Sequence, residues 1–133
     1  MKLENYYTHY SCAPSRGALM TGRYAFKLGM HIANDGSELP LYEVTLAQEL
    51  KTAGYVNYMV GKWHIGFSTD YHLPTQRGFD HFFGYYNGFI DYWTKEFKVR
   101  RASILIFSSN LAMPAITYCI PICLSVCLSL RYL

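Results

Sequence analysis

The segment from Ser11 to Arg23 constrains the fold of this chain more than any other. Pro14 suits the first turn of a helix, where its missing N–H would be unpaired in any case, and Gly22 suits the position just after a last turn. The spacing therefore predicts a helix over residues 14–21. Cys12 then lies at the helix entrance, where free N–H groups favour an anion, and Arg16 lies one turn inside. A thiol in that position ionises easily, so Cys12 is a candidate nucleophile, although a lone cysteine at a helix end is more often structural.

A second helix and a buried strand follow in the middle of the chain. Thr45 with Gln48 three residues later forms a capping-box pattern, and Gly54 ends the helical run. Residues 56–60 read as a buried strand, which places Lys62 and His64 at its carboxyl end. Catalytic groups of open α/β sheets gather at such ends. The two residues are two apart in an extended segment, so both side chains can lie on one face, with a cation beside a potential acid or base.

The remaining pattern is that of an α/β protein. Residues 6–10 read as a short strand that leads into the cysteine segment, and residues 24–40 read as a loop with glycine, asparagine and proline turns. The net charge of +3 comes from scattered lysines and arginines, with no basic run before Arg100 and Arg101. This distribution argues against a nucleic-acid partner.

Two segments resemble the sequence motifs of the sulfatase family. Residues 12–23, CAPSRGALMTGR, resemble the motif in which a cysteine is oxidised to formylglycine, and residues 54–64, GYVNYMVGKWH, resemble the second motif. Glu43 to Leu46, Arg77 to Asp80 and Gly84 to Tyr92 are similar to the arylsulfatase B branch, which includes arylsulfatases I and J. The resemblance covers roughly residues 4–97. The chain departs from the motifs at two positions. Tyr10 stands where the first motif usually has a small residue, and Asn57 stands where the second usually has Ser or Thr; we interpret both as drift within the family.

The resemblance implies a fold and a reaction. The expected fold is part of an alkaline-phosphatase-like sulfatase domain, an α/β domain with a mixed or parallel sheet and flanking helices. The expected activity is that of a sulfuric ester hydrolase of the arylsulfatase type, acting on sulfated sugars of glycosaminoglycans. Cys12, Arg16 and His64 would be catalytic: Cys12 as formylglycine made by the formylglycine-generating enzyme, Arg16 holding its hydroxyl, and His64 assisting it or the leaving group. Lys62 would hold the sulfate oxygens.

Calcium is the cofactor that the resemblance implies. Formylglycine at Cys12 would be one ligand, and the others in the family are an upstream Asp pair and a downstream Asp-Asn pair, which have no counterpart here. Members of the family are also several times longer than 133 residues. We therefore expect an N-terminal catalytic-domain fragment with negligible activity alone. The family is lysosomal or secretory, whereas Met1 to Glu4 does not begin a signal peptide.

The composition changes at Arg101. Residues 102–130 contain no charged side chain, and this run exceeds the ~20 residues that span a bilayer. Pro114 and Pro121 would kink such a helix, and the lysines and arginines before the run would place the sulfatase-like part in the cytosol. We divide the chain into a partial sulfatase domain, residues 1–100, and an unrelated apolar tail, residues 101–133. We interpret the tail as non-homologous read-through rather than a membrane anchor.

Several alternatives stay open at this stage. The first is a non-catalytic, membrane-associated sulfatase-like fragment. The second is a thiol enzyme that uses unmodified Cys12, although a tyrosine-phosphatase-like loop needs its arginine six residues after the cysteine rather than four. The other histidines lack ligand spacing and read as surface or structural residues: His9, His31, His72 and His81. The aspartates that could be taken for metal ligands read as turn or capping residues: Asp35, Asp80 and Asp91. Cys119, Cys123 and Cys127 lack a fourth ligand for zinc.

Overall fold

The structure is a computed structural model of the chain. It describes residues 4–5, 7–31, 37–91 and 93–94, and the backbone of three further strands. Within these described residues there are two α-helices and five strands: α1 (Cys12–Thr21), α2 (Leu46–Thr52), β1 (Tyr55–Lys62), β2 (His81–Tyr85), β3 (Glu96–Val99), β4 (Ala102–Leu105) and β5 (Ser125–Leu130). Three short 3₁₀ turns complete it: η1 (Ala25–Leu28), η2 (Asp70–His72) and η3 (Pro74–Gln76).

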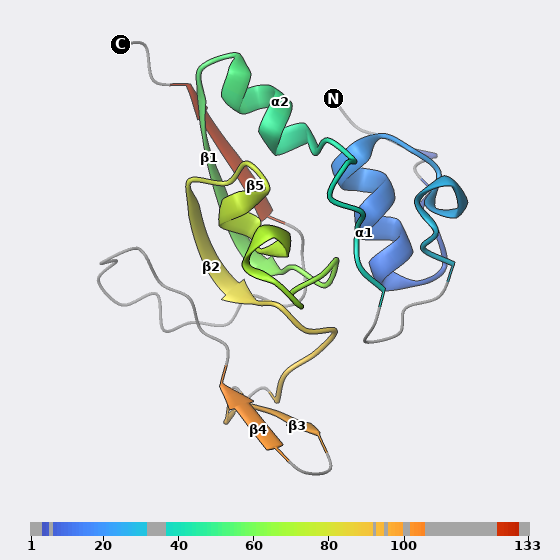
Figure 1. Ribbon diagram of the computed structural model, residues 1–133, viewed down its shortest axis with the longest axis vertical. Helices are drawn as coiled ribbons and strands as arrows, with labels where there is room; N and C mark the ends of the chain where they lie inside the picture. The colour runs from blue at the N-terminus through green and yellow to red at the C-terminus, as the bar shows by residue number, and fades with distance from the viewer. Residues whose placement is uncertain are drawn as a thin grey trace.

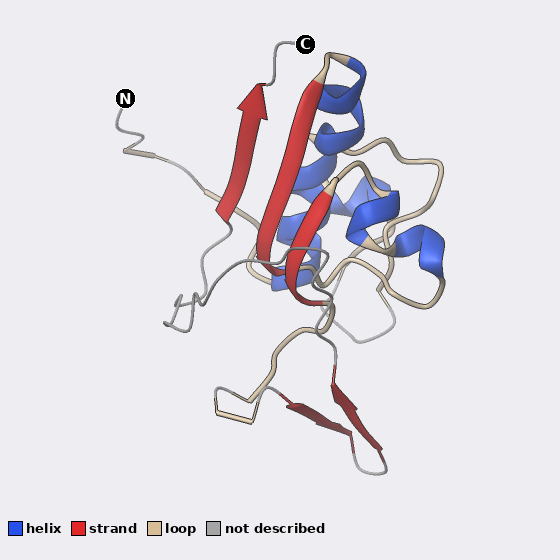
Figure 2. Cartoon of the chain, turned by 90° about the vertical axis from the view of Figure 1, so that its left-hand side faces the viewer, coloured by secondary structure: helices blue, strands red, loops and turns tan. Residues whose placement is uncertain are grey.

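The central sheet has the strand order β2-β1-β5. Strands β1 and β2 are parallel, with Met59 opposite Phe82 and Lys62 opposite Tyr85, whereas β5 runs antiparallel to β1. Helices α1 and α2 lie on one face of this sheet (Figure 2), and the β3–β4 hairpin projects away from it (Figure 1). The predicted α/β class with a mixed sheet and flanking helices matches this arrangement.

Helix α1 begins two residues earlier than predicted, at Cys12 instead of Pro14. The N–H of Ser15 donates to the carbonyl oxygen of Ser11 at 3.1 Å, which closes the first turn. Pro14 still falls within that turn, so its missing N–H removes no intrahelical bond. The predicted end is confirmed, because Gly22 follows the helix in the left-handed conformation with φ of 68°.

The capping box of α2 is also confirmed. The Thr45 hydroxyl accepts from the N–H of Gln48 at 3.2 Å, and the Gln48 side chain accepts from the N–H of Thr45 at 2.9 Å. The following strand is longer than predicted. It starts at Tyr55 and reaches Lys62, because Gly61 and Lys62 still pair with β2. Lys62 is therefore the last residue of β1, and His64 lies two residues after it.

Two other sequence predictions were wrong in part. The described residues 7–10 form no strand, and these residues have no pairing partner among the described strands. Within the region that was predicted as loop, Ala25–Leu28 form the 3₁₀ turn η1, which Gly29 ends at a φ of 71°. Its buried Leu28 packs with Met30 against α1, where a Cβ on Gly17 would lie 2.6 Å from the sulfur of Met30.

The hydrophobic core lies between the sheet and the helices. Trp63 and Phe79 meet edge to face with ring centroids 6.1 Å apart, and Phe82 stacks on Tyr86 at 5.2 Å. The Trp63 ring N–H is satisfied by the carbonyl oxygens of Gly66 and His72. Trp63 directly follows β1 and Tyr86 directly follows β2, so the core holds the segments that leave the carboxyl ends of both parallel strands.

Most of the predicted apolar tail lies outside the described residues, including Cys119 and Cys123 and both prolines of the run. The described parts, β4 and β5, are strands, and β3 pairs with β4 across the predicted boundary at residue 100. Throughout the described part of the chain, no helix has the length and hydrophobicity to cross a bilayer. The two-part division of the chain stays a prediction.

Candidate functional site

The first turn of α1 is joined to the end of β1. The guanidinium of Arg16 donates from Nη1 to the carbonyl oxygen of Lys62 at 2.5 Å, and this contact spans 46 residues of sequence. Both residues are half-buried, as is Cys12 at the start of the helix. The contact therefore brings the two sequence motifs together in space.

Cys12, Arg16 and Tyr85 interact electrostatically. Burial lowers the pKa of Arg16, and negative charge on Tyr85 or Cys12 opposes this effect. Burial raises the pKa of Tyr85, the Arg16 cation lowers it, and Cys12 raises it. Because charge–charge effects of this kind fall with distance, the thiol, the guanidinium and the phenol form one cluster.

Tyr85 enters this cluster from β2. It is the strand partner of Lys62, and its carbonyl oxygen accepts from the N–H of Trp63 at 2.9 Å. The next residue repeats the contact, since the N–H of His64 donates to the carbonyl oxygen of Tyr86 at 2.9 Å. The parallel pairing thus continues past the end of β1 and positions the segment that carries His64.

His64 has an unusual backbone conformation. Its φ is 54°, and among the described residues other than glycine it alone has a positive φ. Its side chain is buried, with 7% exposed. The prediction of an extended segment that includes His64 is therefore wrong, since the chain turns there, and the shared face of Lys62 and His64 stays a prediction. The buried Trp63 lies between them and anchors this turn in the core.

The residues present do not by themselves form a calcium site. In the ranges that the structure describes, no group of three or more His, Cys, Asp or Glu side chains could hold a metal ion. The neighbours of Cys12 are a guanidinium and a phenol, whereas calcium prefers several carboxylate and carbonyl oxygens. The donor set around Cys12 therefore does not fit a calcium ion.

The acidic residues outside the motifs have structural partners. Asp80 accepts from Lys51 Nζ at 2.7 Å and from the N–H of Asn57 at 2.9 Å. Asp91 accepts from the N–H groups of Trp93 and Thr94 at 2.9 and 2.7 Å, which is a turn-capping arrangement. The predicted turn role is confirmed for Asp91, whereas Asp80 links α2 to β1 through Lys51 and the main chain of Asn57 instead of capping a turn. Asp35 lies outside the described residues.

The described histidines outside the motif have contacts consistent with the predicted structural roles. His72 lies 2.8 Å from the hydroxyl of Thr69 through Nδ1 and 3.7 Å from the carboxylate of Glu38 through Nε2. His81 stacks on Tyr58 with ring centroids 4.6 Å apart, and His9 lies against Tyr10 at 4.5 Å. His31 is exposed.

Sequence reasoning missed Tyr85 as a member of the site. The signal was available, because Tyr85 ends β2 as Lys62 ends β1, and the carboxyl ends of parallel strands meet at one edge of a sheet. The sequence motif marks only the first of the two strands. The same rule, extended to the second strand, singles out the half-buried tyrosine.

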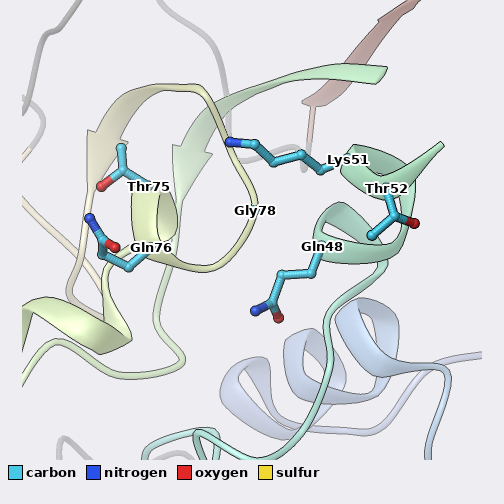
Figure 3. A pocket seen from close by; sticks show the side chains of 6 residues that line it. All are labelled: Gln48, Lys51, Thr52, Thr75, Gln76 and Gly78. Atoms are coloured by element: carbon cyan, nitrogen blue, oxygen red, sulfur yellow. The ribbon is translucent and has the colours of Figure 1, made fainter. Parts of the chain in front are cut away.

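A surface pocket lies apart from these residues. It has a volume of about 430 Å³ and opens between α2 and η3 (Figure 3), and it is lined by Gln48, Lys51, Thr52, Thr75, Gln76 and Gly78. None of the predicted site residues lines it. Its Lys51 is already paired with Asp80. The pocket therefore does not contribute to the site at the strand ends.

The sequence matches known proteins over its first hundred residues. The family model described as Sulfatase matches residues 1–103. The chain is 46% identical to arylsulfatase J of Mus musculus over 98 residues, covering 71% of this chain and 16% of that protein. It is 47% identical to arylsulfatase G of Rattus norvegicus over 77 residues, covering 56% and 14%, and 39% identical to human arylsulfatase A over 90 residues, covering 63% and 18%.

The fold also matches a solved structure. The crystal structure of Ps i-CgsB has a TM-score of 0.56 and 36% sequence identity, and the match covers 61% of this chain and 19% of that chain. The same protein in complex with k-i-k-neocarrahexaose matches with a TM-score of 0.56 and 35% identity. The chain spans less than a fifth of the length of each of these relatives.

Proposed function

The chain belongs to the sulfatase family, and from this premise we propose that it carries the nucleophile-bearing part of a site that hydrolyses sulfate esters. The observation that supports this proposal is the hydrogen bond from Arg16 to the Lys62 carbonyl oxygen, which joins the two motifs. In this proposal Cys12 is the residue that the formylglycine-generating enzyme converts. By family the chain is a sulfuric ester hydrolase of the arylsulfatase type.

The chain's own residues would supply positive charge around the sulfate. Formylglycine, once formed and hydrated, would supply the oxygen that attacks sulfur. Arg16, held between Cys12 and the end of β1, would orient that oxygen, and Lys62 would bind the sulfate oxygens. Both act by stabilising charge that grows on oxygen in the transition state. Tyr85 would add a neutral hydroxyl to the same cluster.

His64 would act as the proton donor to the leaving alcohol. Imidazole is the side chain that most often serves as a general acid in enzymes. The His64 side chain is buried, and its backbone bond to Tyr86 holds its main chain beside the residue that follows β2. When the S–O bond of a sulfate ester breaks, the alcohol oxygen leaves with negative charge and is a poor leaving group unless it receives a proton or contacts another positive group. His64 would provide that proton.

The complete reaction needs groups that this cluster does not provide. Arg16 and Lys62 neutralise sulfate, but a hard cation at formylglycine would need carboxylate ligands. Losing one preorganised donor typically lowers kcat by about 10²–10³. We therefore propose that the 133-residue chain alone has negligible sulfatase activity, and that calcium and its carboxylates complete the site in a whole sulfatase domain.

The proposed substrate is a sulfated sugar of the glycosaminoglycan type. The relatives are named arylsulfatases and, in one human case, steryl-sulfatase, so their names support sulfate esters in general. The structural neighbour that forms a complex with k-i-k-neocarrahexaose favours a saccharide over a sterol. The sequence similarity to the arylsulfatase B branch points in the same direction.

Conversion of Cys12 is the step that tests this proposal most directly. The chain would be expressed in the secretory pathway with formylglycine-generating enzyme, and the peptide that contains Cys12 would be examined by mass spectrometry and by labelling with an aldehyde-specific hydrazide. We expect the mass change of CH₂SH to CHO and hydrazide labelling at this peptide. A Cys12→Ala chain, processed identically, should show neither. An unmodified Cys12 in a secreted, folded chain would overturn the proposal.

A further inference from the structure

Gly88 packs directly against the imidazole of His64. A Cβ placed on Gly88 would lie 2.8 Å from Cε1, 2.9 Å from Nε2 and 3.5 Å from Cδ2 of that ring. Cβ atoms essentially never approach other heavy atoms closer than 3.0 Å. Every residue except glycine would therefore displace the ring, the backbone of residue 88, or both.

The backbone conformation of Gly88 does not require glycine. The described glycines with positive φ are Gly22, Gly29, Gly54, Gly61, Gly66 and Gly78. Gly88 is not among them, so its φ is one that residues with side chains adopt. The space taken by the His64 ring is what excludes a side chain at this position.

The bend at residues 86–88, which contains Gly88, also holds the main chain of His64. The carbonyl oxygen of Tyr86 accepts from the N–H of His64 at 2.9 Å, and Gly88 contacts the ring two residues later. We refer to Tyr86 and Gly88 together as the histidine seat. This seat holds His64, whose φ of 54° is a backbone conformation that residues other than glycine rarely adopt. Two contacts from one bend thus hold a strained residue.

We propose that Gly88 is a positioning residue for the imidazole of His64, and that the absence of a side chain at position 88 sets where the ring lies at the strand ends. The role of this position in catalysis rests on the proposed function, whereas the packing relationship does not. The seat belongs to the segment after β2, which carries none of the predicted catalytic residues. The bend between residues 86 and 88 thereby becomes part of the site.

The packing relationship is tested by a double-mutant cycle in the full chain. Gly88→Ala, His64→Ala and the double variant would be compared by thermal unfolding. We expect Gly88→Ala to lower Tm by about 5 °C or more, as overpacking of a buried contact does. In the His64→Ala background the same change should lower Tm much less, because the ring that it meets is gone. Equal losses in both backgrounds, or a double variant that fails to fold, would overturn the proposal.

A second readout follows the ring itself. In a chain with ¹⁵N-labelled histidines, Gly88→Ala should shift the imidazole resonances and the titration midpoint of His64, while those of His72 and His81 stay in place. A general loss of stability would not shift the His64 resonances selectively. Unshifted His64 resonances in a folded Gly88→Ala chain would therefore also overturn the proposal. Neither readout uses sulfate ester hydrolysis or conversion of Cys12. The histidine seat and the sulfatase proposal can therefore fail separately.

Discussion

Gly84 of β2 lies against the main chain of Gly61 of β1, and a Cβ on Gly84 would come within 1.8 Å of the Gly61 carbonyl oxygen. The two glycines are register partners in the parallel pair. Their approach occurs one residue before Lys62 and Tyr85, the pair at the carboxyl ends of the strands. This contact fixes the spacing of the strands at the point from which the site residues emerge.

Gly84→Ala should therefore separate the parallel strands. The clash involves backbone atoms on both sides, including the Gly61 nitrogen at 2.9 Å, so a rotamer change cannot relieve it. We expect Gly84→Ala to abolish the cooperative thermal transition or to lower the free energy of unfolding by about 3 kcal/mol or more.

The matched control for this variant is Phe83→Ala, on the same strand with 41% of its side chain exposed. It should keep a cooperative transition with a smaller loss of stability, because no backbone contact changes. Circular dichroism with thermal melting measures both. A Gly84→Ala chain that melts like Phe83→Ala would show that the strands are not held this closely.

Asn57 joins three segments from the middle of β1. Its side chain is fully buried, and Nδ2 donates to the carbonyl oxygens of Ala47 at 2.7 Å and Gly78 at 2.8 Å. Asn57→Ala leaves both carbonyls without this donor, and an unsatisfied buried polar group costs about 1–3 kcal/mol. We expect a loss of about 2–4 kcal/mol in the free energy of unfolding by urea titration.

Thr52→Ala provides a matched control for Asn57→Ala. The Thr52 hydroxyl also donates to a carbonyl oxygen, that of Glu49 at 2.6 Å, but at an exposed site. Its removal should change stability by less than about 0.5 kcal/mol. If the two variants unfold at the same urea concentration, the Asn57 side chain does not contribute the predicted stabilisation.

The sequence predicted those features of the fold that are encoded locally. The capping box at Thr45 and Gln48 and the end of α1 at Gly22 depend on neighbouring residues, and both were confirmed. The interpretation of Asn57 as drift within a motif overlooked its structural role, because its partners at Ala47 and Gly78 become neighbours only when α2 and the loop before β2 pack on β1.

The candidate site was predictable to a similar extent. Motif spacing placed Cys12 and Arg16 on one helical turn, and the structure joins that turn to β1 at Lys62. Tyr85 was missed although it ends β2 as Lys62 ends β1. The turn at His64, in contrast, was not predictable from periodicity, because it depends on pairing with β2 beyond the end of β1. Long-range pairing of this kind leaves no local signature.

Asp80 should make the stability of the chain sensitive to acid. Burial would raise its pKa, but the hydrogen bonds from Lys51 and the Asn57 N–H, with the nearby Lys51 and His81 charges, outweigh burial and hold the pKa below its ordinary value of 3.8. A carboxylate with a lowered folded pKa stabilises the fold above its ordinary pKa, and this stabilisation is lost as the pH falls through the folded pKa.

We therefore expect Asp80→Asn to lower stability at neutral pH and to flatten the loss of stability between about pH 5 and pH 2. Urea unfolding at a series of pH values measures this, with Asp70→Asn as the exposed comparison. A variant that keeps the acid dependence of the parent chain would assign that dependence to other carboxylates, such as Glu38, whose pKa is also lowered by hydrogen bonds from Ser68 and Phe67 against the effect of burial.

Tyr85 should report directly on the charges of the site. Burial raises its pKa above the ordinary value of 10.0, Arg16 lowers it, and Cys12 raises it. Arg16→Met should therefore raise the titration midpoint of Tyr85 further, and Cys12→Ala should lower it.

Because the pKa of Tyr85 is raised in the folded chain, the stability linked to its neutral form is present below the ordinary pKa and is lost as the pH rises through the folded value. The phenol stays neutral at physiological pH, so in the proposed site it would offer a hydroxyl rather than a base. Titration of ¹³C-labelled tyrosine rings by NMR, with the Tyr85 signal assigned by Tyr85→Phe, measures the midpoint. Tyr7, which is 85% exposed, serves as the internal comparison and should not respond to either variant. A Tyr85 midpoint that ignores the loss of the Arg16 charge would place the phenol outside the cluster.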